Sequence, residues 1–220
     1  MKSLKNIYQT LYNHFGPQHW WPGDTPFEVI VGAILTQQTS WNNAEKAIKN
    51  LKKENLLDSK KLHDIKNEKL ERLIKSSGYY RQKTKKLKNF MNFLWENYDG
   101  SLEKLFDQPI PKLRKNLLSI NGIGKETADS IILYAANKPI FVIDSYTVRL
   151  INRLGITQEK DYNKIQELFQ KNLSQYVHLF NEYHALIVHL GKNYCKKKPR
   201  CDECPLKQNC NSAKKNLESQ

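Results

Sequence analysis

Apolar side chains recur at helical spacing along almost the whole chain, and the alternating pattern of a β-strand is nearly absent. This periodicity constrains the chain to an all-α fold. Thr25 followed by Pro26 is a typical helix start, and Gly155 is a typical helix end. The expected helices lie at about residues 3–15, 26–37, 41–54, 59–75, 81–98, 110–119, 125–137, 145–154, 160–173 and 175–193.

Two segments are expected not to be helical. The apolar stretch 138–143 is short, so we expect it to be extended and to cross between two halves of the molecule. The tail after Cys210 is polar, and we expect it to be frayed.

The chain carries a large excess of positive charge. Its 220 residues contain 36 Lys and Arg against 22 Asp and Glu, which gives a net charge of +14. Such an excess favours a polyanionic partner, most often nucleic acid, although lysine enrichment in an AT-rich genome would also produce it. No apolar run approaches the roughly 20 residues that cross a membrane, and the N-terminal segment has no signal-peptide core. We therefore expect a cytoplasmic protein without a membrane partner.

Four cysteines fall close together near the C-terminus, at Cys195, Cys201, Cys204 and Cys210. Because disulfides are rare inside cells, four thiolates in one short segment indicate a metal site. A four-iron, four-sulfur cluster is favoured, since zinc sites more often use two CxxC pairs; zinc remains the alternative. The basic stretch 196–200 suits a phosphate backbone, and the site is expected to act mainly as a structural staple.

A glycine turn separates two expected helices in the segment INGIGKETA. Gly122 and Gly124 allow a positive φ and close backbone approach. With Lys125 and the start of the next helix, the turn is expected to bind phosphate rather than to read bases. Further along the chain, Asp144 follows an apolar run at a helix start, where its plain interpretation is a helix N-cap.

Taken together, these motifs carry a family resemblance. GIGKETAD (122–129), FVIDSYTVRLINRLG (141–155) and the C-x5-C-x2-C-x5-C pattern jointly resemble the endonuclease III (helix-hairpin-helix) superfamily of DNA glycosylases. GAILTQQTS (32–40) is similar to the family's glutamine segment, and SGYYRQKTKKL (77–87) is similar to its DNA-wedging loop. The resemblance spans about residues 25–210, which is nearly the whole chain.

The resemblance implies a two-lobed all-α fold with a C-terminal iron–sulfur cluster loop. Residues 25–136 would form a helical barrel domain that carries the helix-hairpin-helix. Residues 1–24 and 137–220 would form a second helical domain with the catalytic aspartate and the cluster, and the active site would lie in the cleft between the lobes. A monomer bound to damaged double-stranded DNA of the nucleoid is expected.

The same resemblance assigns roles in base excision repair. Such enzymes flip a damaged base out of the duplex to reach its glycosidic bond. Asp144 would stabilise positive charge on the sugar and help to activate water. Gln38 and Tyr79 would fill or wedge the vacated stack, while Gly122, Gly124 and Lys125 would hold the DNA backbone.

The chain departs from the family pattern at two places. Bifunctional members carry a nucleophilic lysine where this chain has Glu126, and Lys125 lies about 100° away around the helix. The sequence therefore predicts base excision without AP lyase chemistry. The first two cysteines are separated by five residues, where the family usually has six; the number of ligands is unchanged.

An aromatic segment indicates the substrate. HWWPGDTPFEVI (19–30), together with GIGKE and SGYY, is similar to the 3-methyladenine glycosylase branch, in which such aromatic residues line the base pocket. An alkylated purine is cationic and stacks well on tryptophan. The pocket residues implied by this resemblance are Trp20, Trp21, Pro22, Trp41, Glu126 and Lys192. The alternative is that the tryptophans only close the interface between the lobes.

Two other functions stay open. One is a monofunctional glycosylase of the same superfamily that acts on uracil, on thymine in a mismatch, or on adenine. The other is a catalytically silent protein that binds DNA structures, against which the presence of Asp144 argues.

Overall fold

The structure, a computed structural model, describes residues 3–218, and these residues contain helices and connecting segments but no β-strand. The predicted all-α fold class is therefore confirmed. The chain divides into two compact units: unit 1 comprises Met1–Trp20 and Pro139–Gln220, and unit 2 comprises Trp21–Lys138.

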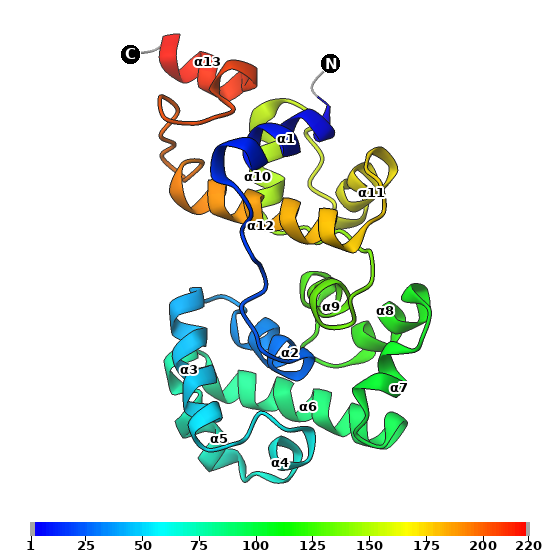
Figure 1. Ribbon diagram of the computed structural model, residues 1–220. Helices are drawn as coiled ribbons and strands as arrows, with labels where there is room; N and C mark the ends of the chain where they lie inside the picture. Colours follow the sequence, from blue (N-terminus) through cyan, green and yellow to red (C-terminus); the bar gives the residue numbers. More distant parts are fainter. Residues whose placement is uncertain (1–2, 219–220) are drawn as a thin grey trace. The chain divides into compact units, whose positions relative to one another are not determined.

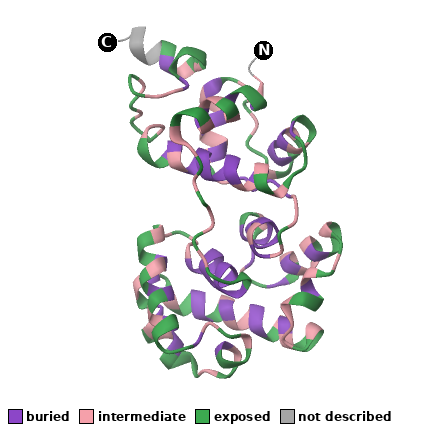
Figure 2. Ribbon diagram, viewed as in Figure 1, coloured by how far each residue is buried: buried purple, intermediate pink, exposed green. Residues whose placement is uncertain are grey.

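Unit 2 is built around one helix that is buried on all sides. Every residue of α2 (Pro26–Leu35) except Pro26 is buried, as the continuous purple ribbon in Figure 2 shows. The helices α3 (Trp41–Lys53), α6 (Tyr80–Tyr98) and α9 (Lys125–Ser130) pack against it (Figure 1). The remaining elements of unit 2 are α4 (Ser59–Asp64), α5 (Asn67–Leu73), η1 (Lys75–Ser77), α7 (Leu102–Phe106), α8 (Ile110–Ser119) and the π-helix η2 (Ile131–Ala135).

Unit 1 is organised around α12 (Val177–Asn193), which packs against α1 (Leu4–Phe15) and α10 (Ser145–Leu154). Its core contains an aromatic cluster in which the rings of Phe141 and Phe169 stack with centroids 4.1 Å apart. The remaining elements of unit 1 are α11 (Tyr162–Asn172), η3 (Lys207–Asn209) and α13 (Asn211–Glu218).

The extended stretch that enters unit 1 is buried, so its backbone groups need partners. Two glutamines of α11 supply them for Phe141. Gln170 Oε1 accepts a hydrogen bond from the Phe141 amide at 3.0 Å, and Gln166 Nε2 donates to the Phe141 carbonyl at 2.7 Å. The side chains from Ile140 to Ile143 are thereby fixed in the core, directly before Asp144.

The structure differs from the sequence-based helices in two internal places. The expected helix 59–75 is divided into α4, α5 and η1, because Lys88 of α6 donates to the carbonyl oxygens of Leu62, His63 and Ile65 and ends α4 there. The expected helix 125–137 changes into the π-helix η2 after Ser130.

Two further helices were not expected. The short helix α7 was missed. The tail expected to be frayed forms α13, which is anchored because Ala213 is buried and because α13 packs on α10. Within residues 3–218, no helix is long and apolar enough to cross a membrane.

Candidate active site, DNA-contacting turns and metal centre

Asp144 occupies the N-cap of α10, so its plain interpretation as a helix cap is correct. Its Oδ1 accepts hydrogen bonds from the Thr147 amide at 2.7 Å and from Thr147 Oγ1 at 2.9 Å. The side chain is only 10% exposed. The cap therefore fixes the carboxylate at the start of the helix and uses one of its two oxygens.

The other carboxylate oxygen faces a histidine. His184 Nε2, from the buried side of α12, lies 3.6 Å from Asp144 Oδ2. Burial alone raises the pKa of Asp144, but the interaction with His184 and then the hydrogen bonds from Thr147 lower it, and the resulting pKa lies below the ordinary value. The carboxylate is consequently charged at neutral pH although it is nearly buried. His184 was not among the residues predicted from the sequence, where its only signal is a histidine within an apolar helical run.

Two more of the expected pocket residues lie in unit 1 and contact one another. The ammonium group of Lys192 stands 5.4 Å from the centroid of the Trp20 ring, a cation–π distance. Partial burial lowers the pKa of Lys192, and the charge on Asp144 opposes part of that shift. Glu182 Oε1 accepts a hydrogen bond from the Gln18 amide at 2.6 Å, which ties the segment before Trp20 to α12.

The adjacent Trp21 belongs to unit 2 and has different neighbours. Its ring lies edge-on to Trp41 at a centroid distance of 5.6 Å and is 5.1 Å from the ring of Tyr134. A Cβ at Gly32 would lie 3.3 Å from Trp21 Nε1, so this glycine leaves space for the indole. Tyr134, which sequence reasoning missed, comes from the π-helix η2, and Pro22 is exposed beside the group.

The glycine turn connects α8 to α9, and its two glycines have different roles. Gly122 has a φ of +98°, and a Cβ there would meet Lys86 Cγ at 2.3 Å. Gly124 has an ordinary φ of −91°, and a Cβ there would meet no atom within 4 Å. The fold thus requires a glycine only at the first position. The next residues are the half-buried Lys125 and the exposed Glu126.

Gln38 and Tyr79 both lie on exposed turns of unit 2 with a strained backbone. Their φ values are +54° and +45°, a region that non-glycine residues rarely occupy. The side chain of the neighbouring Gln37 is used internally: Nε2 donates to the Gly122 carbonyl at 3.1 Å and to Thr127 Oγ1 at 2.9 Å. The structure therefore connects the glutamine segment to the glycine turn through Gln37 and presents Gln38 to solvent.

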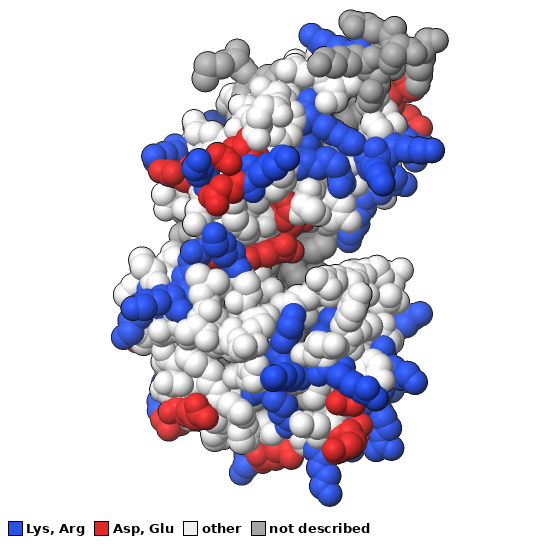
Figure 3. Space-filling model, turned by 180° about the vertical axis from the view of Figure 1, so that it is seen from behind, with Lys and Arg blue, Asp and Glu red and all other residues white. Residues whose placement is uncertain are grey.

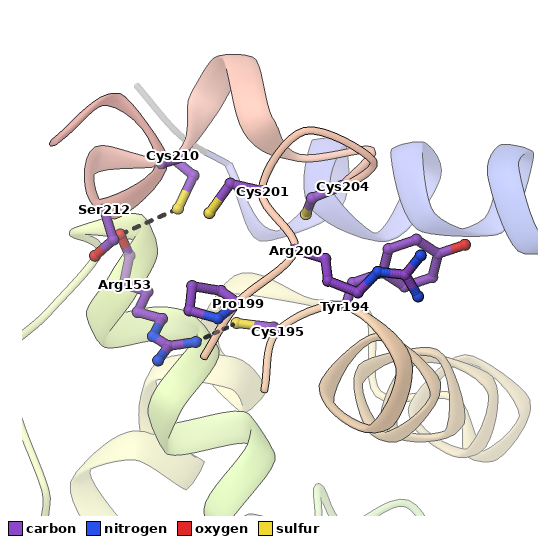
Figure 4. Close-up of a pocket in the computed structure, with 10 residues that line it drawn as sticks. Arg153, Tyr194, Cys195, Pro199, Arg200, Cys201, Cys204, Cys210 and Ser212 are labelled. Carbon is purple, nitrogen blue, oxygen red and sulfur yellow. Dashed lines mark hydrogen bonds between the residues drawn. The ribbon is translucent and has the colours of Figure 1, made fainter. Parts of the chain in front are cut away.

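All four cysteines line one pocket, together with residues that include Arg153, Tyr194 and Pro199 (Figure 4). Burial raises the pKa of the Cys204 thiol to about 11, and the three other cysteine thiols add to the rise. Thiols are donors that a metal centre binds in their deprotonated form, and all four line this pocket. Within residues 3–218, no three potential ligands are gathered closely enough to hold a single metal ion.

The segment between the first two cysteines is held by Arg153 of α10. Its guanidinium donates to Cys195 Sγ at 3.2 Å, and its backbone carbonyl accepts from Cys210 Sγ at 3.4 Å (Figure 4). The guanidinium also donates to the Lys196 carbonyl at 2.6 Å. The basic segment 196–200 is thereby fixed beside the pocket. Positive side chains also predominate over negative ones on the face shown in Figure 3.

A family model described as "HhH-GPD superfamily base excision DNA repair protein" matches residues 31–175, which is more than half of the chain. The chain belongs to this superfamily. At this level it is a base excision repair DNA glycosylase, and the predicted membership of the endonuclease III superfamily is confirmed, whereas the branch within it stays a prediction.

Individual relatives agree with the HhH-GPD assignment. A Methanocaldococcus jannaschii protein, provisionally named a DNA repair glycosylase, is 50% identical over 210 residues, which are 94% of this chain and 95% of the relative. The structure is similar to that of H. pylori 3-methyladenine DNA glycosylase bound to 1,N6-ethenoadenine, with a TM-score of 0.75 and 29% identity over 85% of this chain and 96% of that one. It is also similar in fold to an endonuclease III trapped as a covalent intermediate with DNA, with a TM-score of 0.84 and 23% identity over 99% and 100% of the two chains.

The two glycines of the turn can be separated by substitution. Gly122→Ala should lower the free energy of unfolding by about 1–3 kcal/mol, because alanine is strained at this φ and its methyl group would collide with Lys86. Gly124→Ala should change stability by less than about 0.5 kcal/mol but weaken DNA binding, because a methyl group would stand where a phosphate approaches. Thermal unfolding and duplex-binding titrations measure both effects. Equal losses of stability would contradict this distinction.

His184→Gln should move the acid limb of the pH profile of kcat/KM to higher pH. The wild-type pKa of Asp144 lies below its ordinary value of 3.8, so this carboxylate, if it is the group that limits the rate in acid, stays charged until the pH falls below that value. Without His184 the effect of burial dominates, and protonation begins at higher pH. His178→Gln, an exposed change on the same helix, is the control. Identical acid limbs for wild type and His184→Gln would refute the role of His184.

Proposed function

We propose that the chain is a monofunctional DNA glycosylase that removes an alkylated purine, such as 3-methyladenine, from double-stranded DNA. One observation carries the proposal: the carboxylate of Asp144 is nearly buried, is held at the start of α10 by two hydrogen bonds from Thr147, and has His184 Nε2 3.6 Å from its other oxygen. Hydrolysis of an N-glycosidic bond needs such a fixed anion, because positive charge develops on the sugar as the base departs.

The proposed mechanism follows from how Asp144 is held. The damaged nucleotide is flipped out of the duplex, since its glycosidic bond is inaccessible inside the stack. Thr147 keeps Oδ1 fixed at the start of α10, so the carboxylate is already oriented before the substrate arrives. Its charge stabilises the cationic sugar and orients a water molecule for attack. Water is the nucleophile.

The identity of residue 126 supports a monofunctional enzyme. Bifunctional members of the superfamily use a lysine amine at this place, and this chain has an exposed glutamate. Lys125 precedes Glu126 by one residue, so its side chain leaves α9 about 100° away around the helix axis from that of Glu126. The product is therefore an intact strand that carries an abasic site.

Aromatic side chains support an alkylated purine as the substrate. A cationic base stacks well on an indole ring, and Trp21, Trp41 and Tyr134 provide grouped rings in unit 2. We assign the main stacking role to Trp41 and Trp21, and flanking roles to the other expected pocket residues, which are Trp20, Pro22, Glu126 and Lys192. The similarity to an enzyme solved with 1,N6-ethenoadenine supports the same class of modified purine.

DNA contacts are assigned to three turns of unit 2 and to the general positive charge. Gly122, Gly124 and Lys125 hold the phosphate backbone, and Gly124 leaves open space for that approach. Gln38 and Tyr79, which is 63% exposed, enter the space that the flipped base leaves. The net charge of +14 strengthens binding to any duplex in a salt-dependent way.

We further propose that the four cysteines hold a four-iron, four-sulfur cluster. Four thiol donors that line one pocket fit such a centre. When bound, the cluster supplies structural stabilisation, and no step of base removal depends on it. Arg149 and Arg153 of α10 would help to hold the cysteine segment around the cluster, because they donate to the backbone carbonyls of Cys195 and Lys196.

Asp144→Asn tests the catalytic assignment. The change keeps the shape of the side chain and a helix cap but removes the charge, so we expect base release to fall by roughly 10²–10³-fold while duplex binding is kept. Asp161→Asn is the matched control, because Asp161 also caps a helix, accepting from the Lys164 amide at 3.0 Å. Single-turnover assays with gel-shift titrations give both quantities. An active Asp144→Asn protein would sink the assignment.

The metal proposal has a direct readout. The purified protein should be brown with broad visible absorbance and contain about four iron atoms per chain. Cys204→Ala should lose iron and destabilise unit 1, because a bound metal centre contributes folding free energy. Elemental analysis and thermal unfolding measure the two effects. A colourless protein with one tightly bound zinc ion would show that the cluster assignment is wrong.

A further inference from the structure

Lys83 is a lysine whose charged end is buried inside unit 2. It lies in the first turn of α6, and the residue is only 2% exposed. Its Nζ donates to the carbonyl of Leu35 at 2.8 Å and to the carbonyl of Ser77 at 2.6 Å. Leu35 is the last residue of α2, and Ser77 is the last residue of η1. One ammonium group therefore joins the C-terminal ends of two separate helices.

Each of these carbonyls is followed by a strained, exposed turn. Gln38 comes three residues after Leu35, and Tyr79 comes two residues after Ser77. Both have positive φ values although neither is glycine. Such conformations cost free energy and persist only when the surrounding structure holds them in place. The ammonium group of Lys83 is in position to do so for both turns at once.

The network continues to a third turn. Lys86, one helical turn after Lys83, donates to Gln37 Oε1 at 2.5 Å, and Gln37 Nε2 donates to the Gly122 carbonyl and to Thr127 Oγ1. The aliphatic part of Lys86 also lies against Gly122, where it fills the space that a Cβ would need. Two lysines of α6 thus connect the turns of Gln38, Tyr79 and Gly122 within one unit.

The burial of Lys83 has a cost. Burial lowers the pKa of its ammonium group to about 8, and the nearby charge of Lys86 adds to the shift. A buried ammonium group is disfavoured unless hydrogen bonds offset the loss of its hydration. The carbonyls of Leu35 and Ser77 supply that offset, so the side chain stays in the core only while it holds both helix ends.

We propose that Lys83 is a positioning residue that fixes the turns of Gln38 and Tyr79 in one arrangement, with Lys86 and Gln37 extending that arrangement to the glycine turn. The two exposed side chains are then presented to the duplex together, in a geometry set before DNA binds. Preorganisation of this kind lowers the ordering cost of binding. The inference rests on the proposed function, because it assumes that Gln38 and Tyr79 enter the base stack.

The experiment compares Lys83→Met with Lys88→Met. Lys88 lies on the same helix, its pKa is also lowered by burial, and its ammonium group also donates to backbone carbonyls, but those belong to the end of α4. The readout is the fluorescence of 2-aminopurine placed opposite a stable abasic-site analogue in a duplex saturated with protein. Entry of side chains into the stack unstacks this base and raises its fluorescence, and no turnover is needed.

We expect the wild type and Lys88→Met to give the full rise, and Lys83→Met to lose most of it. The single-turnover rate on an alkylated duplex should fall on the order of tenfold for Lys83→Met. Lys88→Met should keep the wild-type rate, although both variants lose stability because each leaves backbone carbonyls without a donor. In a Gln38→Ala/Tyr79→Ala background, Lys83→Met should have no further effect, because the side chains through which it acts are gone.

Gln37→Ala is a second variant, at a half-buried position. It keeps both contacts of Lys83 but removes the link to the glycine turn, so it should lose part of the fluorescence rise. The inference is overturned if Lys83→Met and Gln37→Ala keep the full fluorescence rise. It is also overturned if Lys88→Met loses as much of the rise as Lys83→Met, or if the wild-type protein binds the duplex without any rise. Base release by the wild type is scored in a separate assay. If no base is released, the glycosylase proposal is refuted, but the fluorescence measured on the abasic duplex still tests the role of Lys83.

Discussion

The proposed active site depends on one carboxylate that is held at a helix start and kept charged where solvent hardly reaches it. Asp144 Oδ1 is bonded to the amide and hydroxyl groups of Thr147, and Oδ2 faces His184. Burial opposes the charge, and these partners outweigh that effect. A helix cap and a catalytic anion are often treated as competing interpretations of such an aspartate. Here the capping bonds are what would orient the anion for catalysis.

The same principle, a polar side chain that fixes backbone in a helical scaffold, recurs in unit 2. Arg114 of α8 forms two hydrogen bonds with Asp129 of α9, at 2.7 Å and 3.1 Å, and Asp129 is fully buried. This pair clamps the two helices on either side of the glycine turn. Lys83 and Lys88 hold the ends of other helices. The exposed turns are therefore short segments between firmly held ends.

The sequence predicted the features whose causes are local. The all-α class follows from periodicity, and α2 and α10 begin where Thr25 and Asp144 cap them. The features that were not predicted depend on contacts between residues far apart in the sequence. The division of the expected helix 59–75 depends on Lys88, and α13 depends on the burial of Ala213. His184, Tyr134 and Lys83 were missed for the same reason, because only packing shows which side chains meet Asp144, Trp21 and the two carbonyls.

A borohydride-trapping assay on single-lesion duplexes distinguishes water from a lysine as the nucleophile and identifies the base that is released. The protein is incubated with duplexes that each carry one lesion, namely 3-methyladenine, uracil or a G·T mismatch, in the presence of borohydride, and free base, strand cleavage and covalent adduct are scored. The account predicts release of the alkylated purine, a strand that is cut only after added alkali, and no trapped adduct, because Glu126 stands where a nucleophilic lysine would be. Preferred release of uracil or thymine would contradict the substrate assignment, and efficient trapping of an enzyme–DNA adduct would contradict water as the nucleophile.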